Sequence, residues 1–155
     1  MFSEVADSDG KTIKTVAISA KNCADWMVFD VACCISDMTS VTLYDTLGKE
    51  ATGYILNQCE IKSVFCESNQ IKELVELKKN REVDHLEYLV CMDVAEISDI
   101  KKAEDAGLHV LTFANVEHAG LKSQTELPSP KSDSVFTICY TSETTGFPKG
   151  AMISH

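Results

Sequence analysis

The sequence lacks an apolar run of the ~20 residues that a membrane-spanning helix needs. Its start, Met1-Phe2-Ser3-Glu4, also lacks the basic and apolar stretches of a signal peptide. We therefore expect neither a transmembrane segment nor export directed by this stretch of chain.

Basic residues are scarce. Lys and Arg number 14 against 24 Asp and Glu, which gives a formal net charge of -10 at pH 7. Nucleic-acid-binding proteins usually carry clustered Lys and Arg that displace counterions from phosphates. This charge balance therefore argues against DNA or RNA as a partner, and the scattered carboxylates otherwise indicate a soluble surface.

Paired cysteine motifs are missing as well, although the chain has seven cysteines. No two of them have the C-x-x-C spacing of a zinc or redox site. Because most lie among apolar residues, we expect buried, reduced thiols of a cytosolic protein. The seven are Cys23, Cys33, Cys34, Cys59, Cys66, Cys91 and Cys139.

Short apolar runs rich in β-branched residues alternate with helical patterns along most of the chain. With 45% hydrophobic residues, the chain can build one packed core. The alternation is typical of a parallel sheet with crossover helices. We predict six strands, at Thr12 to Ser19, Ser40 to Leu43, Lys62 to Cys66, Glu87 to Met92, His109 to Phe113 and Val135 to Thr141.

The first predicted helix runs from Trp26 to Ile35, with Asn22 as the capping residue. Apolar residues on nearly every side of it predict that it is largely buried. The next helix carries an apolar stripe at Ala51, Tyr54, Ile55 and Cys59.

A third helical stripe contains Ile71, Leu74 and Val75 and follows Ser68 as a cap. A fourth predicted helix, Glu96 to Ala106, ends at Gly107, a residue that can adopt the left-handed conformation. Because βαβ crossovers are almost always right-handed, we predict an α/β fold with three αβα layers around a mainly parallel sheet.

Residues 122–134 are rich in Ser, Pro, Lys and Thr, and Pro128 and Pro130 interrupt any regular structure. We predict an exposed connector there. Too few residues follow it to fold alone, so residues 1–155 are expected to belong to one domain.

The segment with the clearest chemistry is residues 140–155, where the last predicted strand enters a short loop followed by another strand. Its first eleven residues read Y-T-S-E-T-T-G-F-P-K-G. Four hydroxyl residues, two glycines and a lysine can donate many short hydrogen bonds to a polyphosphate. Lys149 adds a flexible charge, while Gly146 and Gly150 let the backbone bend or approach a ligand.

This loop does not have the Walker A pattern, because Gly146 does not lead to Gly-Lys-Ser or Gly-Lys-Thr at the required spacing. From residue types alone, a polar surface loop with a solvated lysine remains the alternative. The order of the residues, however, resembles the adenylate-forming superfamily signature Y-T-S-G-T-T-G-x-P-K-G. Every position from Tyr140 to Gly150 agrees with it except Glu143.

A second resemblance is to eukaryotic-type long-chain fatty acyl-CoA synthetases. The run from Val41 to Gly48, V-T-L-Y-D-T-L-G, is similar to their V-P-L-Y-D-T-L-G, with Thr42 in place of proline. Asn22 to Trp26 and Asp30 to Ala32 are similar to their N-x-P-E-W and D-x-A. A purely structural role for the run, with Tyr44 and Leu47 packing a turn, remains open.

The resemblance implies an incomplete part of the N-terminal AMP-binding domain of a long-chain fatty acid–CoA ligase. Such enzymes use ATP and Mg²⁺ to convert a fatty acid to an acyl-adenylate, which coenzyme A then converts to acyl-CoA. Remaining catalytic residues are expected beyond His155, so the chain alone is expected to be inactive. The residues implied to hold the ATP phosphates are Thr141, Ser142, Thr144, Thr145, Gly146, Lys149 and Gly150.

Glu143 is the main departure from the signature, because a carboxylate stands where the family has glycine. Charge repulsion and backbone strain there are expected to weaken ATP binding. A non-catalytic truncated homologue acting only as a binding domain is therefore the alternative function. A free-standing flavodoxin-like or receiver domain would fit the alternation of elements but leaves the loop unexplained.

The family also implies a location on the cytoplasmic side, at the endoplasmic reticulum or another internal membrane. Peripheral membrane association would depend on parts outside these 155 residues.

Overall fold

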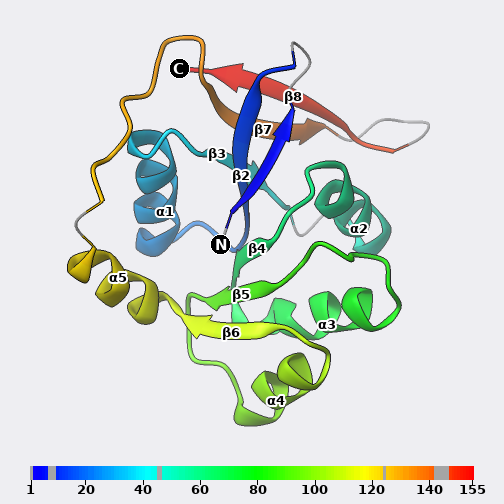
Figure 1. Ribbon diagram of the computed structural model, residues 1–155. Helices are drawn as coiled ribbons and strands as arrows, with labels where there is room; N and C mark the ends of the chain where they lie inside the picture. The colour runs from blue at the N-terminus through cyan, green and yellow to red at the C-terminus, as the bar shows by residue number, and fades with distance from the viewer. Residues whose placement is uncertain (1, 7–9, 45–46, 124, 142–146) are drawn as a thin grey trace.

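The alternating pattern folds into a single sheet with helices on both sides (Figure 1). The computed structural model describes residues 2–6, 10–44, 47–123, 125–141 and 147–155. The strands are β1 (Ser3–Ala6), β2 (Thr12–Ser19), β3 (Thr39–Thr42), β4 (Ser63–Cys66), β5 (Tyr88–Cys91), β6 (His109–Thr112), β7 (Val135–Thr141) and β8 (Lys149–Ser154). The helices are α1 (Ala24–Ile35), α2 (Lys49–Gln58), the 3₁₀ turn η1 (Ser68–Gln70), α3 (Ile71–Lys79), α4 (Ile97–Asp105) and α5 (Phe113–Lys122).

The strand order across the sheet is β6-β5-β4-β2-β3-β7-β8, with β1 paired to β2. All pairings from β6 to β7 are parallel, whereas β1 and β8 pair antiparallel with their neighbours. The predicted α/β class with a mainly parallel sheet is therefore confirmed. All six predicted strands are present, with ends shifted by at most one residue. The short strand β1 was not predicted.

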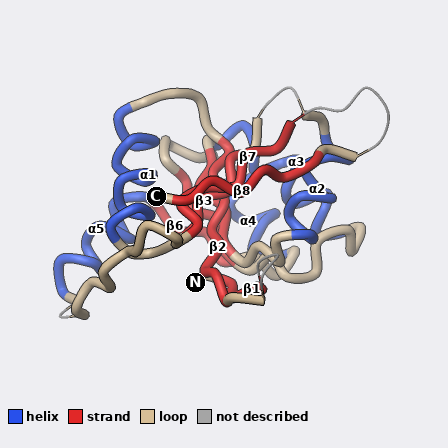
Figure 2. The backbone as a smooth tube through the Cα atoms, turned by 90° about the horizontal axis from the view of Figure 1, so that it is seen from above, coloured by secondary structure: helices blue, strands red, loops and turns tan. Residues whose placement is uncertain are grey.

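The sheet lies between two helical layers (Figure 2). Helices α2, α3 and α4 contribute to one core, and α1 and α5 flank the other. Successive buried residues of the central strands point to opposite faces of the sheet. Ala17 of β2 packs in the core with α2, α3 and α4, and Ile18 packs in the core with α1 and α5. Burial of both faces explains why these strands are nearly continuous apolar runs.

Helix α1 corrects two sequence predictions. Its N-cap is Cys23, whose Sγ accepts from the backbone N of Trp26 at 3.4 Å. The prediction of Asn22 as the cap was therefore wrong. The N-cap position, with its extended backbone, is one residue later, and only a side chain there reaches the backbone N of Trp26.

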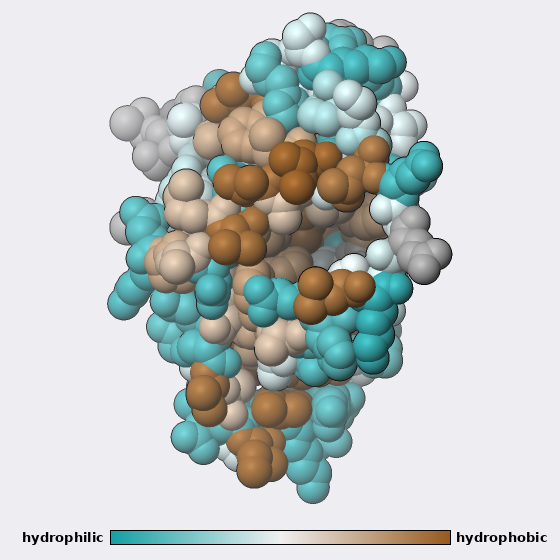
Figure 3. Space-filling view, turned by 90° about the vertical axis from the view of Figure 1, so that its left-hand side faces the viewer, coloured by the Kyte–Doolittle hydropathy of each residue, from teal (hydrophilic) through white to brown (hydrophobic). Residues whose placement is uncertain are grey.

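The expected burial of α1 was also wrong, because only Phe29 and Cys33 are buried among its twelve residues. The sheet covers one side of the helix, and the other side exposes apolar groups to solvent. Apolar side chains gather on this side of the molecule (Figure 3). Those of α1 that are about half exposed are Met27, Val28, Val31 and Ile35.

Helix α5 was missed, and the predicted strand from His109 to Phe113 ends one residue earlier. Thr112 Oγ1 accepts from the backbone N of Asn115 at 3.1 Å, and Asn115 Oδ1 accepts from the backbone N of Thr112 at 3.0 Å. This capping box starts the helix at Phe113. Asn115 stands where a capping box usually has Glu or Gln, so the sequence did not show the usual capping-box pattern.

Ser68 was predicted to cap α3 but begins the 3₁₀ turn before it. Its backbone N and Oγ donate to the Asp93 carboxylate at 2.6 and 2.8 Å. The serine therefore ties the end of β4 to the end of β5. In α4, by contrast, Gly107 follows the helix with φ of 83°, as predicted.

All seven cysteines are free thiols. Cys33, Cys59, Cys66 and Cys91 are buried, Cys34 and Cys139 are partly buried, and Cys23 is exposed. None of the helices in the described part of the chain is both long and apolar enough to span a membrane.

Candidate functional site

The loop with the phosphate-binding pattern joins two hydrogen-bonded strands. Strand β7 is parallel to β3, so its end at Thr141 lies at the carboxyl edge of the parallel sheet. Strand β8 returns antiparallel and places Lys149 opposite Thr141, whose Oγ1 donates to the Lys149 carbonyl oxygen at 3.5 Å. Ligands of open α/β sheets bind at this edge.

Three of the predicted phosphate-binding residues, Thr141, Lys149 and Gly150, lie within the described structure. Thr141 and Lys149 are exposed and face each other across the base of the hairpin. The other four, Ser142, Thr144, Thr145 and Gly146, lie outside the described residues, as does Glu143.

Tyr140 fixes the incoming strand of this hairpin to helix α2. Its side chain is 6% exposed, and its hydroxyl donates to Gln58 Oε1 at 2.8 Å. The Cys59 Sγ lies 3.2 Å from the same hydroxyl. Burial, followed by the Cys59 contact, raises the pKa of Tyr140 well above its usual value. The tyrosine is therefore a neutral structural anchor.

Phe147 makes a similar contact on the outgoing side of the loop. Its ring stacks on Tyr54 of α2 with centroids 4.6 Å apart and planes at 16°. Both ends of the loop thus contact one helix. The contact was not predicted, because Phe147 occupies the variable position of the signature. The sequence did contain one indication of this contact, namely a large aromatic residue within a loop of otherwise small and polar residues.

The run from Val41 to Gly48 lies beside this hairpin, since it contains the end of β3 and Gly48, the N-cap residue of α2. Leu43 is 5% exposed, and Leu47 packs against the same core. Thr42 Oγ1 donates to the Tyr44 hydroxyl at 3.2 Å. The structural role considered for this turn therefore fits Leu47, whereas Tyr44 is 47% exposed and does not pack in the core.

Gly150 has a packing reason to be glycine. A Cβ built on it would lie 2.9 Å from Ile138 Cγ2 and 3.0 Å from Tyr140 Cζ. Strand β8 therefore passes unusually close to the Tyr140 ring. A cavity of about 200 Å³ lies beside this contact and is lined by Gly150, Tyr140 and Gln58, but not by Thr141 or Lys149.

Gly150→Ala is expected to lower the free energy of unfolding by about 1–3 kcal/mol, because the new methyl group overpacks the hairpin. The matched control is Gly120→Ala in α5, where a Cβ meets nothing within 4 Å. Removing a helical glycine there should stabilise by about 0.5–1 kcal/mol. Urea denaturation of both variants measures the difference, and a neutral Gly150→Ala would contradict the close packing.

The family of the chain is shown by its match to a family model. The family model described as AMP-binding enzyme matches residues 9–155. The chain belongs to this family. The match covers every described element except β1, which precedes it.

Similar curated proteins of this AMP-binding family include long-chain-fatty-acid–CoA ligase 5 of Mus musculus, 35% identical over 141 residues. That alignment covers 90% of this chain and 21% of the relative. Ligase 1 of Homo sapiens is 33% identical over 141 residues, covering 90% of this chain and 20% of the relative. The chain therefore spans about a fifth of the length of these relatives.

Solved structures support the fold. The adenylation domain of a Mycobacterium chelonae carboxylate reductase superposes with a TM-score of 0.77 at 17% identity, covering 99% of this chain and 31% of that one. The A domain of a Segniliparus rugosus carboxylic acid reductase, solved with AMP and a co-purified carboxylic acid, gives 0.74 at 17% identity. It covers 99% of this chain and 32% of that one. The predicted adenylate-forming fold is thus confirmed.

Proposed function

We propose that this AMP-binding-family chain contributes the ATP phosphate-binding hairpin of a long-chain fatty acid–CoA ligase. In that reaction a fatty acid carboxylate attacks the α-phosphate of ATP, which gives an acyl-adenylate and pyrophosphate. The thiol of coenzyme A then displaces AMP. The 30–35% identity to curated long-chain ligases over about nine-tenths of this chain supports this substrate class.

The observation that carries the proposal is the hydroxyl-rich and lysine-containing hairpin at the carboxyl edge of the sheet. Thr141 and Lys149 face each other there and are both exposed to a ligand. Their donors suit the charge that builds on a pyrophosphate leaving group. The proposed phosphate-binding set is Thr141, Ser142, Thr144, Thr145, Gly146, Lys149 and Gly150.

Helix α2 has a supporting role in this proposal. Tyr140 and Phe147 lie on either side of the loop, and both contact α2. The helix is itself fixed by Ile55 and Leu56, which are 0% and 1% exposed. A loop held at both ends loses less conformational entropy when it binds a ligand.

Mg²⁺ and coenzyme A belong to the proposed reaction of the longer enzyme. Bound Mg²⁺ would neutralise phosphate charge. Within the described residues, no group of three or more His, Cys, Asp or Glu side chains could hold a metal ion. We therefore propose none of them as a Mg²⁺ ligand. Association with an internal membrane remains a family-based proposal.

The test is the loss of ATP binding when Lys149 is removed, measured in chains that also carry Glu143→Gly. Lys149→Ala is expected to weaken ATP binding roughly ten- to a hundredfold, because it removes a charge-assisted hydrogen bond worth about 1.5–3 kcal/mol. Lys149→Arg keeps the charge and should lose less. Phosphorus NMR titration with ATP measures these affinities. Equal affinity with and without Lys149 would contradict the proposed hairpin function.

A further inference from the structure

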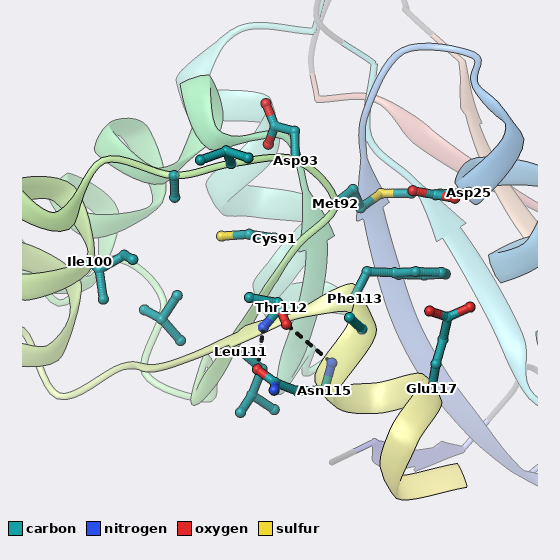
Figure 4. Close-up of a pocket in the computed structure, with 14 residues that line it drawn as sticks. Asp25, Cys91, Met92, Asp93, Ile100, Leu111, Thr112, Phe113, Asn115 and Glu117 are labelled. Atoms are coloured by element: carbon teal, nitrogen blue, oxygen red, sulfur yellow. Dashed lines mark hydrogen bonds between the residues drawn. The ribbon is translucent and has the colours of Figure 1, made fainter. Parts of the chain in front are cut away.

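A cavity of about 540 Å³ lies at the carboxyl ends of β5 and β6 (Figure 4). Its lining comes from both faces of the sheet, because Cys91 packs in the core with α2, α3 and α4, whereas Met92 and Phe113 pack against the core with α1 and α5. Cys91 is 3% exposed, so its thiol is not accessible from this cavity. A more accessible thiol lies on the exposed side of α1.

Cys34 of α1 lies beside a histidine. Its Sγ is 3.9 Å from Nδ1 of His155, the residue that follows β8. Two contacts hold the histidine there: its backbone N donates to the Ser134 carbonyl oxygen at 3.1 Å, and its ring packs on Phe136 with centroids 5.4 Å apart. When the imidazole proton is on Nε2, Nδ1 can accept the thiol proton. Since Cys34 is only partly buried and His155 is exposed, the pair has the arrangement of an accessible thiol nucleophile and its base.

An apolar depression of about 400 Å³ adjoins Cys34 on the side of the molecule shown in Figure 3. Val31 precedes Cys34 by three residues, and residues at this spacing are neighbours on a helix surface. None of the described residues that line the depression is charged, and the net charge of the chain, -10, disfavours an anionic ligand. The depression therefore suits an uncharged, apolar chain. The residues that line it are Met27, Val28, Val31, Ala32 and Ile35.

We propose that Cys34 is a site of S-acylation by neutral thioesters of apolar carboxylic acids, with His155 as the base and the depression on α1 holding the acyl chain. The Cys34 sulfur attacks the thioester carbonyl carbon and forms a new C–S bond, while His155 Nδ1 takes the thiol proton. The carbonyl group then re-forms, the original C–S bond breaks, and the leaving thiolate takes that proton from the imidazolium. One thioester is exchanged for another, so the step needs no oxidant or reductant. It uses neither ATP nor the hairpin and goes beyond the proposed ligase reaction.

The experiment incubates the folded chain with two neutral thioesters that differ only in chain length, the S-acetyl and S-octanoyl derivatives of N-acetylcysteamine. Peptide mass spectrometry measures the acylation rate at each cysteine, normalised to the rate of free N-acetylcysteine with the same reagent. With the octanoyl thioester, Cys34 is expected to react about tenfold or more faster than Cys139, which is also partly buried. At Cys34 the normalised octanoyl rate should exceed the acetyl rate several-fold, because burial of the additional methylene groups stabilises the bound chain.

Two substitutions separate the base from the acyl-chain site. His155→Ala should slow acylation of Cys34 by both thioesters about tenfold, whereas Val31→Ser should slow only the octanoyl reaction. Val94→Ser is the matched control for Val31→Ser, since Val94 is 94% exposed and does not line the depression. Because His155 and Val31 are both exposed, neither substitution is expected to unfold the chain.

Three results would each overturn the proposal. They are equal octanoyl rates at Cys34 and Cys139, an unchanged Cys34 rate in His155→Ala, and equal normalised rates at Cys34 with the two thioesters.

Discussion

Replacing Glu143 with glycine is expected to strengthen ATP binding by about tenfold or more, if the hairpin is the phosphate site. A carboxylate ~4 Å from a phosphate charge is repelled by about 4 kcal/mol at an effective dielectric of ~20. Where the signature's glycine uses a left-handed backbone, a residue with Cβ costs about 1–2 kcal/mol more. The repulsion alone exceeds a tenfold change in affinity, and the backbone cost alone corresponds to about five- to thirtyfold.

Glu143→Gln is the matched control for this substitution, because it removes the charge but keeps the Cβ. Recovery of most of the affinity by glutamine assigns the weakness to repulsion, whereas recovery by glycine alone assigns it to the backbone. Phosphorus NMR titration at low and high salt distinguishes them further, since salt screens only the charge term. Unchanged ATP binding by the glycine variant would show that Glu143 does not oppose the nucleotide.

The strands were predictable because both their faces are buried, which leaves a nearly continuous apolar run in the sequence. Strand β7 was predicted with its observed ends, Val135–Thr141. Strand β1 was missed because its four residues pair at the start of β2 and show only a weak pattern of their own. A segment with so weak a pattern becomes a strand only because it pairs with a neighbouring strand, here β2.

The error at α1 has a different origin. Its sequence is apolar on nearly every side, a pattern typical of a helix that neighbouring elements cover all round. Local sequence does not say which element covers each side, and here the sheet covers only the side of Phe29 and Cys33. The apolar residues were therefore identified correctly, but their burial depended on neighbours that the pattern does not specify.

The candidate site shows the same division between local chemistry and distant contacts. Hydroxyl, glycine and lysine residues in one short stretch are a local feature, so the loop was found from sequence. The contacts that fix its ends join Tyr140 to Gln58 and Phe147 to Tyr54, residues more than 80 positions apart. Nothing in a single sequence indicates such a pair, and only the register of β7 beside β3 brings α2 under the hairpin.

The core between the sheet and α2 to α4 should hold much of the chain's stability, and Leu89→Ala tests this. Leu89 is 0% exposed in β5 and pairs in register with Val64 and Val110. Its truncation removes buried apolar area and leaves a cavity that neighbouring strands cannot fill, which costs about 2–5 kcal/mol. Since domains of this size are stable by about 5–15 kcal/mol, the urea midpoint should fall markedly.

Leu121→Ala makes the same chemical change at a side chain that is 85% exposed in α5. Its free energy of unfolding should change by no more than about 0.5 kcal/mol, because water already surrounds the leucine. The denaturant slope should match between the two variants, which would assign the difference to the native core rather than to the unfolded chain. Equal destabilisation at both positions would mean that β5 is not enclosed as the strand order β6-β5-β4 requires.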